Sequence, residues 1–178
     1  QLESNQTGAE TTETTGVTAF NSDGYTGGAL DQINGTTATN SFVDWLWKAG
    51  GAPVTNNAGS ITSQVSANVE AGFSIVTYTG TGANATVGHG LGKAPGFIIT
   101  FDRAGGNDHQ CWHAGLSGNT YYIPLNQPNA QSNVNGALMW NSTSPTSSVF
   151  SLGSYGGVNG STRTYVAYCF AEIPGFSK

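Results

Sequence analysis

The stretch that decides the fold is GFSIVTYTGTGANATVGHGLGKAPGFIITF, residues 72–101. Its two ends, 72–79 and 96–101, are rich in Val, Ile, Thr, Phe and Tyr, the residue types enriched in β-strands. Glycines recur every few positions between them and interrupt any helical pattern. The stretch therefore predicts two strands joined by a glycine-rich connection.

The same pattern continues on both sides of this stretch. Short apolar runs alternate with Gly/Asn turns such as 34–35, 135–136 and 159–160, and no long stripe of helical period appears. Regular strands between such turns are typical of a sandwich, jelly roll or barrel. We predict an all-β fold, an antiparallel β-sandwich that is jelly-roll-like, with an extended N-terminal arm. The further strands predicted are 17–20, 41–47, 110–114, 120–124, 137–141, 148–152 and 164–172.

Two parts of the chain resemble each other. AFNSDGY at 19–25 matches VFSLGSY at 149–155, with Phe20 opposite Phe150, and an Asn-Gly turn follows each. SFVDWLW at 41–47 then matches TYVAYCF at 164–170, and alternation places Val43, Trp45 and Trp47 on one strand face, as it does Val166, Tyr168 and Phe170. The repeat predicts an extended polar arm at 1–16, the C-terminal half of a preceding module-like repeat at 17–50, a connector at 51–68 and a complete β-sandwich module at 69–178.

Charge is scarce and limits the partners. Only 8% of residues are charged, the net charge is −5, and the five basic residues are scattered along the chain. They cannot form a basic stripe that follows phosphates, so we predict no nucleic-acid partner. No apolar run approaches the roughly 20 residues of a spanning helix, so we also predict no membrane insertion.

The chain has two cysteines, Cys111 and Cys169. An even number permits one disulfide but does not require it. Both lie in strand-like runs, where small buried thiols are common. The sequence leaves the bridge and two free thiols as alternatives.

Four elements resemble a repeated module of tail-fibre and other structural proteins of marine bacteriophages. In that family GF-x-x-x-x-Y-x-G opens the module and GHGLG-x-AP follows, at 72–80 and 88–95 here. WN-x-T-x-P-T-S-S-x-F and YVAYCFAE come next, at 140–150 and 165–172. The AFNSDG and FVDWLWKAGG segments also resemble the end of a preceding module. The resemblance covers most of the chain from Val17 onward.

The resemblance implies a place on the virion, exposed outside the cell, and a role in host attachment or receptor binding. It names no settled ligand and no catalytic residue. We predict a homo-oligomer, for which a trimer fits a fibre, with other virion proteins as partners and a host-surface glycan as the ligand. A capsid decoration protein or purely structural spacer of the virion is one alternative, and a secreted carbohydrate-binding module is another.

The sequence gives little support to catalysis. Glycosidases need two carboxylates that flank one bond, and the nearest pair is Asp102 and Asp108, on either side of a Gly-Gly loop. More simply, Asp102 would end a strand and Asp108 would close a turn. No G-x-S-x-G elbow is present. We predict that the chain is not an enzyme.

Histidines and one cysteine give the candidate metal ligands. His109, Cys111 and His113 alternate, so a strand would place all three on one face, and their donor atoms suit zinc or copper. The spacing does not match that of structural zinc sites, and a half-buried strand with a core cysteine fits equally. We predict no metal and no other cofactor. His89, within a glycine-rich loop, is expected to hold that loop by a hydrogen bond to a carbonyl.

Aromatic and amide side chains near predicted loops give the candidate binding surface. Aromatic faces stack on sugar rings, and amides bond sugar hydroxyls. Each ring taken singly fits a sandwich core as well as a ligand site. The candidate ligand residues are Trp112, Tyr121, Tyr122, Asn126, Trp140 and Tyr155.

Overall fold

The computed structural model describes residues 1–35 and 41–175, which form two compact units. The N-terminal unit is Thr11–Trp47, together with Gln1. It contains β1 (Val17–Phe20), β2 (Tyr25–Gly27) and the single-turn helix α1 (Asp31–Asn34). The main unit comprises Leu2–Glu10 and the described residues from Lys48 onward. Its elements are β3 (Val54–Asn56), β4 (Ser63–Asn68), β5 (Phe73–Thr79), β6 (Ala85–Gly88), β7 (Pro95–Asp102), β8 (Gln110–His113), β9 (Ile123–Pro124), α2 (Gly136–Trp140), β10 (Val149–Leu152), α3 (Gly156–Asn159) and β11 (Thr164–Ala171).

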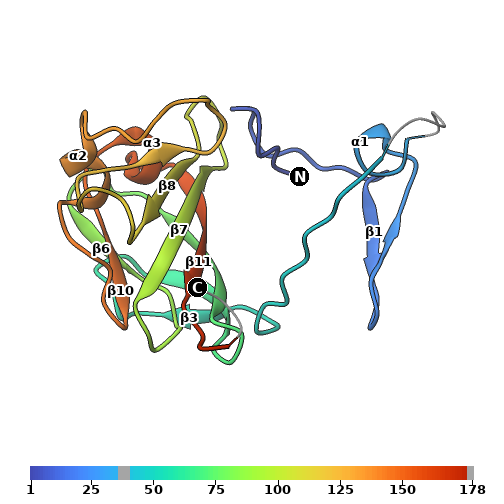
Figure 1. Ribbon diagram of the computed structural model, residues 1–178, viewed down its shortest axis with the longest axis horizontal. Coiled ribbons are helices and arrows are strands. Elements are labelled where there is room, and N and C mark those ends of the chain that lie inside the picture. Colours follow the sequence, from blue (N-terminus) through green and yellow to red (C-terminus); the bar gives the residue numbers. More distant parts are fainter. Residues whose placement is uncertain (36–40, 176–178) are drawn as a thin grey trace. The chain divides into compact units, whose positions relative to one another are not determined.

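The main unit is built on a seven-stranded antiparallel sheet in the order β3-β4-β5-β11-β7-β8-β9. The last strand, β11, lies at its centre and pairs with both β5 and β7 (Figure 1). A second, two-stranded sheet pairs β10 with β6. The fold is therefore all-β, antiparallel and sandwich-like, as predicted.

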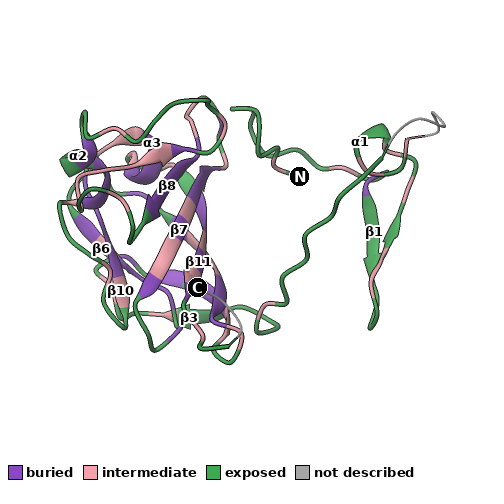
Figure 2. Cartoon of the chain, in the orientation of Figure 1, coloured by how far each residue is buried: buried purple, intermediate pink, exposed green. Residues whose placement is uncertain are grey.

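The core lies between the large sheet and the β6–β10 pair. Alternation along β11 sends Tyr165, Ala167 and Cys169 into it, and all three are fully buried. Phe150 and Leu152 of β10 belong to the same cluster. Figure 2 shows this burial concentrated in the main unit, whereas β1 is exposed.

The sheet register separates the two cysteines. Cys169 lies opposite Ile98, and Cys111 lies opposite the next residue of β7, Ile99. Because side chains alternate between the faces of a sheet, the two thiols lie on opposite faces. Both cysteines are free and buried, so the disulfide alternative is ruled out.

Most predicted strands are confirmed within a residue or two, but three predictions are wrong. Residues 137–141 lie in helix α2 and the residue after it, and 41–47 form no strand. The segment 51–68, predicted as a connector, contains β3 and β4 of the large sheet. β4 has the sequence SQVSAN, and its buried residues include Ser63 and Ser66, so the apolar alternation that marks a strand is weak there.

The N-terminal arm packs on the main unit along part of its length. The backbone N–H of Glu10 donates to Arg103 O at 2.9 Å, and that of Gly106 donates to Thr7 O at 2.7 Å. Glu10 also forms an ion pair with Arg103. The ring of His109 bonds Glu3 O through Nε2 at 2.9 Å. These contacts hold the arm against the loop between β7 and β8.

The N-terminal unit repeats the hydrogen bonds that precede β11. Asn34 Nδ2 donates to Gly28 O at 3.0 Å, just as Asn159 Nδ2 donates to Gly153 O at 2.8 Å. The helices α1 and α3 have the same length, similar dihedral angles at both caps, and an Asn-Gly end. A Cβ on Gly28 or Gly153 would lie about 2 Å from a backbone oxygen, 2.3 and 2.1 Å respectively. The sequence repeat is therefore also a structural repeat.

The register of the repeat differs from the one predicted. Because Gly28 corresponds to Gly153, Phe150 corresponds to Tyr25 and not to Phe20. The match of Phe20 with Phe150 is therefore five residues out of register. The pairing of the two Asn-Gly turns was predicted correctly.

Within the described ranges, no helix has the length and apolar character needed to cross a bilayer.

Candidate functional site

The outer face of the large sheet, opposite the core, carries a row of rings across neighbouring strands. Phe73, Phe170, Phe97 and His113 face one another in register on β5, β11, β7 and β8. Successive ring centroids lie 4.9, 5.6 and 5.8 Å apart, within the range of favourable aromatic contacts. This row makes the outer face apolar and flat along one line.

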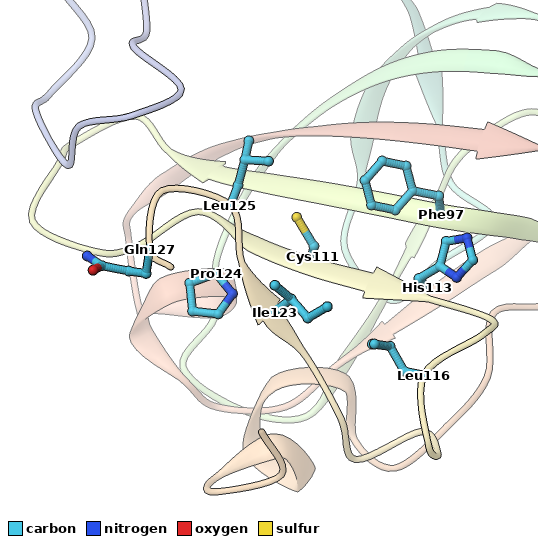
Figure 3. A pocket seen from close by; sticks show the side chains of 8 residues that line it. All are labelled: Phe97, Cys111, His113, Leu116, Ile123, Pro124, Leu125 and Gln127. Atoms are coloured by element: carbon cyan, nitrogen blue, oxygen red, sulfur yellow. The ribbon is translucent and has the colours of Figure 1, made fainter. Parts of the chain in front are cut away.

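A hollow of about 370 Å³ lies at the β8–β9 end of this row (Figure 3). Strand β7 contributes Phe97, β8 contributes Cys111 and His113, and β9 contributes Ile123 and Pro124. Figure 3 shows the Phe97 and His113 rings side by side at one end and Gln127 at the other. The hollow is open to the surface and is the candidate site. Its complete lining is Phe97, Cys111, His113, Leu116, Ile123, Pro124, Leu125 and Gln127.

The lining is mostly apolar and offers few polar atoms. Burial raises the pKa of the Cys111 thiol to about 12, so it stays protonated at neutral pH. His113 Nδ1 accepts the Gly115 N–H at 2.9 Å, which leaves Nε2 as its remaining polar atom. The Gln127 amide donates to Asp108 Oδ1 at 3.0 Å. A ligand here would meet apolar surface, a ring edge and few polar groups.

Two of the three candidate metal ligands, Cys111 and His113, lie on the outer face of β8, and His109 directly precedes the strand. Nε2 of His109 is engaged by Glu3 O, and the ring packs on Phe101 with centroids 4.0 Å apart. Cys111 is buried as a protonated thiol. Across residues 1–35 and 41–175, no group of three His, Cys, Asp or Glu side chains could hold a metal ion.

The structure separates the six candidate ligand residues. Trp112 and Trp140 lie in the core with 5% and 2% of their surface exposed, so their ring faces cannot receive a sugar. Tyr122 and Tyr155 are partly buried against that core. Tyr121 is half-buried in the loop before β9. The proposed aromatic surface therefore does not form from these rings.

Asn126 lies in the chain between two lining residues of the hollow, Leu125 and Gln127. Its amide donates to Asp108 Oδ1 at 2.8 Å and its carbonyl accepts the His109 N–H at 3.1 Å. Asn126 therefore fixes the loop that carries Leu125 and Gln127 and has a structural role.

The two carboxylates considered for catalysis are both engaged in structural contacts. Asp102 is buried, and its oxygens accept bonds from Arg163, the Asn107 amide and the Ala104 N–H. Asp108 holds the Asn126 and Gln127 amides. Neither carboxylate lines the hollow.

Sequence reasoning missed the apolar residues that form the hollow. Phe97, Ile99 and Phe101 alternate with Ile98 and Thr100 along β7, so both faces of this strand carry large apolar side chains. A strand with one solvated face alternates with polar residues instead. That departure was the available signal for Phe97, whereas Leu116, Leu125 and Gln127 come from loops whose folding the pattern does not reveal.

The whole chain, residues 1–178, matches the model of one protein family, described as domain of unknown function DUF7483. No curated protein matches the chain. No solved structure matches it either.

Proposed function

We infer that this chain, which belongs to the DUF7483 family, is a non-catalytic attachment module of a bacteriophage tail fibre or similar virion appendage. The observation that carries this proposal is the open apolar hollow beside the Phe97 and His113 rings. Its protonated thiol and apolar lining suit contact with a ligand surface. The resemblance of the four sequence elements to phage fibre modules supports the virion location.

The ligand class that we propose is a cell-surface polysaccharide. Sugar rings present apolar C–H faces, which stack on aromatic side chains and carry no charge. Gln127 and His113 Nε2 are the polar groups at the rim that could bond a hydroxyl. The low charge of the chain, 8% of residues, fits a neutral ligand.

A structural role within the virion is the second candidate. The lining of the hollow is mostly aliphatic, with Leu116, Ile123, Pro124 and Leu125 on one side. Such a surface also fits a leucine or an aromatic side chain of another virion protein. In that case the chain is a spacer or capsid decoration protein.

We also propose that the chain forms homotrimers. Strand β3 ends the large sheet, and its Val54 is 64% exposed. An unpaired edge of this kind is commonly covered by another chain. Light scattering of the purified chain measures the mass directly, and a monomer would contradict this part of the proposal.

A polysaccharide array tests the attachment role. The chain should bind at least one bacterial surface polysaccharide, and Phe97→Ala should weaken binding by roughly tenfold through loss of a stacking ring. Leu138→Ala, an exposed apolar residue of α2 outside the hollow, is the matched control and should bind normally. Equal binding by both variants would remove the hollow from the proposal. No polysaccharide binding by the intact chain would favour the spacer or decoration role.

A further inference from the structure

The N-terminal unit repeats only the closing part of the main unit, by which we mean β10, α3 and β11. The apolar side chains of its segment 41–47 are exposed. We propose that residues 15–35 and 41–47 form a docking surface for the opening half of a further module of this kind. By opening half we mean a segment with strands equivalent to β4 to β9. The main unit contains the same closing part bound to its own opening half, and so shows what covers this surface.

In the main unit, the loop between β5 and β6 is hydrogen-bonded to the closing part through Asn159. Asn159 is fully buried, and its amide donates to Ala83 O at 2.6 Å. Its carbonyl accepts the Thr81 N–H at 2.8 Å, and the Gly82 N–H donates to Asn159 O at 2.8 Å. These bonds join segments that lie far apart in the chain.

The N-terminal unit has the equivalent of the bond from Asn159 to Gly153 O, but among its described residues it has no equivalent of the bonds to the β5–β6 loop. Asn34 keeps its bond to Gly28 O, yet it is exposed. The bonds that Asn159 makes to residues 81–83 have no counterpart among residues 1–35 and 41–47. The amide geometry is therefore preformed for a loop that the N-terminal unit does not supply.

The apolar residues of the strand-like segment 41–47 are exposed where those of β11 are buried. Phe42 and Leu46 are 40% and 62% exposed, whereas their counterparts Tyr165 and Cys169 are both 0% exposed. An isolated two-stranded hairpin such as β1–β2 is marginally stable in water. A surface that brings strands to both sides of 41–47 would bury these side chains and pair the segment.

One position departs from the pattern, and the N-terminal unit compensates for it. Ala167, which faces the core from β11, corresponds to Asp44. A carboxylate there must be hydrogen-bonded to be buried at an acceptable cost. The Tyr25 hydroxyl, at the position of Phe150, is hydrogen-bonded to Asp44. Where the main unit has two apolar core residues, Phe150 and Ala167, the N-terminal unit has a polar pair.

The occupant is a separate opening half and not the opening half of a second copy of this chain. In each copy β11 already lies between β5 and β7, and β10 already pairs with β6. The places that 41–47 and β2 would take are therefore filled. Docking on another copy would require displacement of its own closing strand.

The test extends the full chain ahead of Gln1 with a second copy of residues 48–135, which include β3 to β9. Hydrogen exchange followed by mass spectrometry then reports on residues 41–47. They form no strand in the chain alone, and their amides should exchange at least ~100-fold more slowly in the extended chain, as in a paired strand. The added segment should fold together with them.

Asn34→Ala in the extended chain should abolish most of this protection, because the bonds to the 81–83 loop of the added segment cannot form. Asn21→Ala is the matched control, since Asn21 is an exposed asparagine in the β1–β2 turn. It should leave the protection unchanged. In the chain without the extension, neither variant should alter exchange in 41–47.

Three results would overturn the proposal. Rapid exchange of 41–47 beside a folded added segment would show that the surface does not receive it. An added segment that stays unfolded beside an intact main unit would show the same. Slow exchange of 41–47 in the chain alone, together with a dimeric mass, would identify a second copy as the occupant.

Discussion

At the residue scale, His89 shows how a buried polar group holds a loop in this protein. Its Nε2 donates to Thr146 O at 3.1 Å, and its Nδ1 accepts the Leu91 N–H at 3.2 Å. These partners define a neutral ring with its proton on Nε2. A second proton would have to sit on Nδ1, opposite the Leu91 donor. The loop role predicted for His89 is confirmed.

The pH dependence of unfolding follows from this burial. Burial lowers the pKa of His89 below its usual 6.5, and the bond to Thr146 only partly offsets this effect. The unfolded chain then binds a proton that the folded chain refuses, so His89 makes stability fall as pH drops below about 6.5. Denaturant titrations between pH 5 and 8, compared for the wild type and His89→Asn, measure this contribution.

His89→Asn should remove that part of the slope and lower stability by about 1–3 kcal/mol at neutral pH, because buried Leu91 and Thr146 groups lose a partner. His113→Asn, at an exposed histidine, is the control and should change neither quantity much. An unchanged slope in His89→Asn would contradict the assignment of a neutral buried ring.

Asp102 is the second residue whose removal should be costly. It is fully enclosed and joins Arg163 to the β7–β8 loop through Asn107 and Ala104. Asp102→Asn should lower the free energy of unfolding by about 2 kcal/mol, because it removes a charged acceptor from a buried network. Glu10→Gln, which breaks the exposed pair with Arg103, should cost less than about 1 kcal/mol. Equal losses in urea titrations would show that the Asp102 network is not structural.

At the element scale, the packed arm depends on a loop that only glycine allows. Gly105 has φ +77° and Gly106 has φ +89°, both in the left-handed region. A Cβ on Gly105 would lie 2.5 Å from Ala9 N, whereas nothing lies within 4 Å of one on Gly106. A side chain would strain the backbone at both positions, but only a side chain at Gly105 would collide with the arm.

Gly105→Ala should release the arm, and Gly106→Ala should not. Both variants should lose about 1 kcal/mol of stability to backbone strain. Only Gly105→Ala should also speed amide exchange in residues 3–10, because its methyl group would displace Ala9. Equal exchange of the arm in the two variants would mean that the arm does not depend on this contact.

An element can be predicted from the sequence when its buried positions hold apolar residues in a recognisable pattern. Strands such as β5 and β11 carry apolar residues on both faces and were predicted. β4 was missed because its buried positions include Ser63 and Ser66. α2 was taken for a strand because its five residues, GALMW, are too few to show a helical period.

The candidate site was less predictable than the fold. Rings near turns suggested a ligand surface, but Trp112 and Trp140 fill the core instead. The residues that form the hollow meet through the β7–β8–β9 register and through loops, neither of which a strand pattern specifies. Only Phe97, on a strand that is apolar on both faces, gave a sequence signal.

At the scale of the whole molecule, one closing element occurs twice in a chain with little charge. In the main unit it completes a sandwich-like core, and in the N-terminal unit its apolar face is exposed. An element that occurs twice fits the fibre that we propose, in which one module would repeat along the length.

The central claim is that this chain belongs to a virion appendage, and immunogold electron microscopy tests it most directly. Antibodies raised against the purified chain would be applied to intact particles of a phage whose genome carries its coding sequence. Gold confined to the tail appendages is the predicted result. Gold spread over the capsid would indicate a decoration protein instead, and particles without gold would contradict a virion location and favour a secreted carbohydrate-binding module.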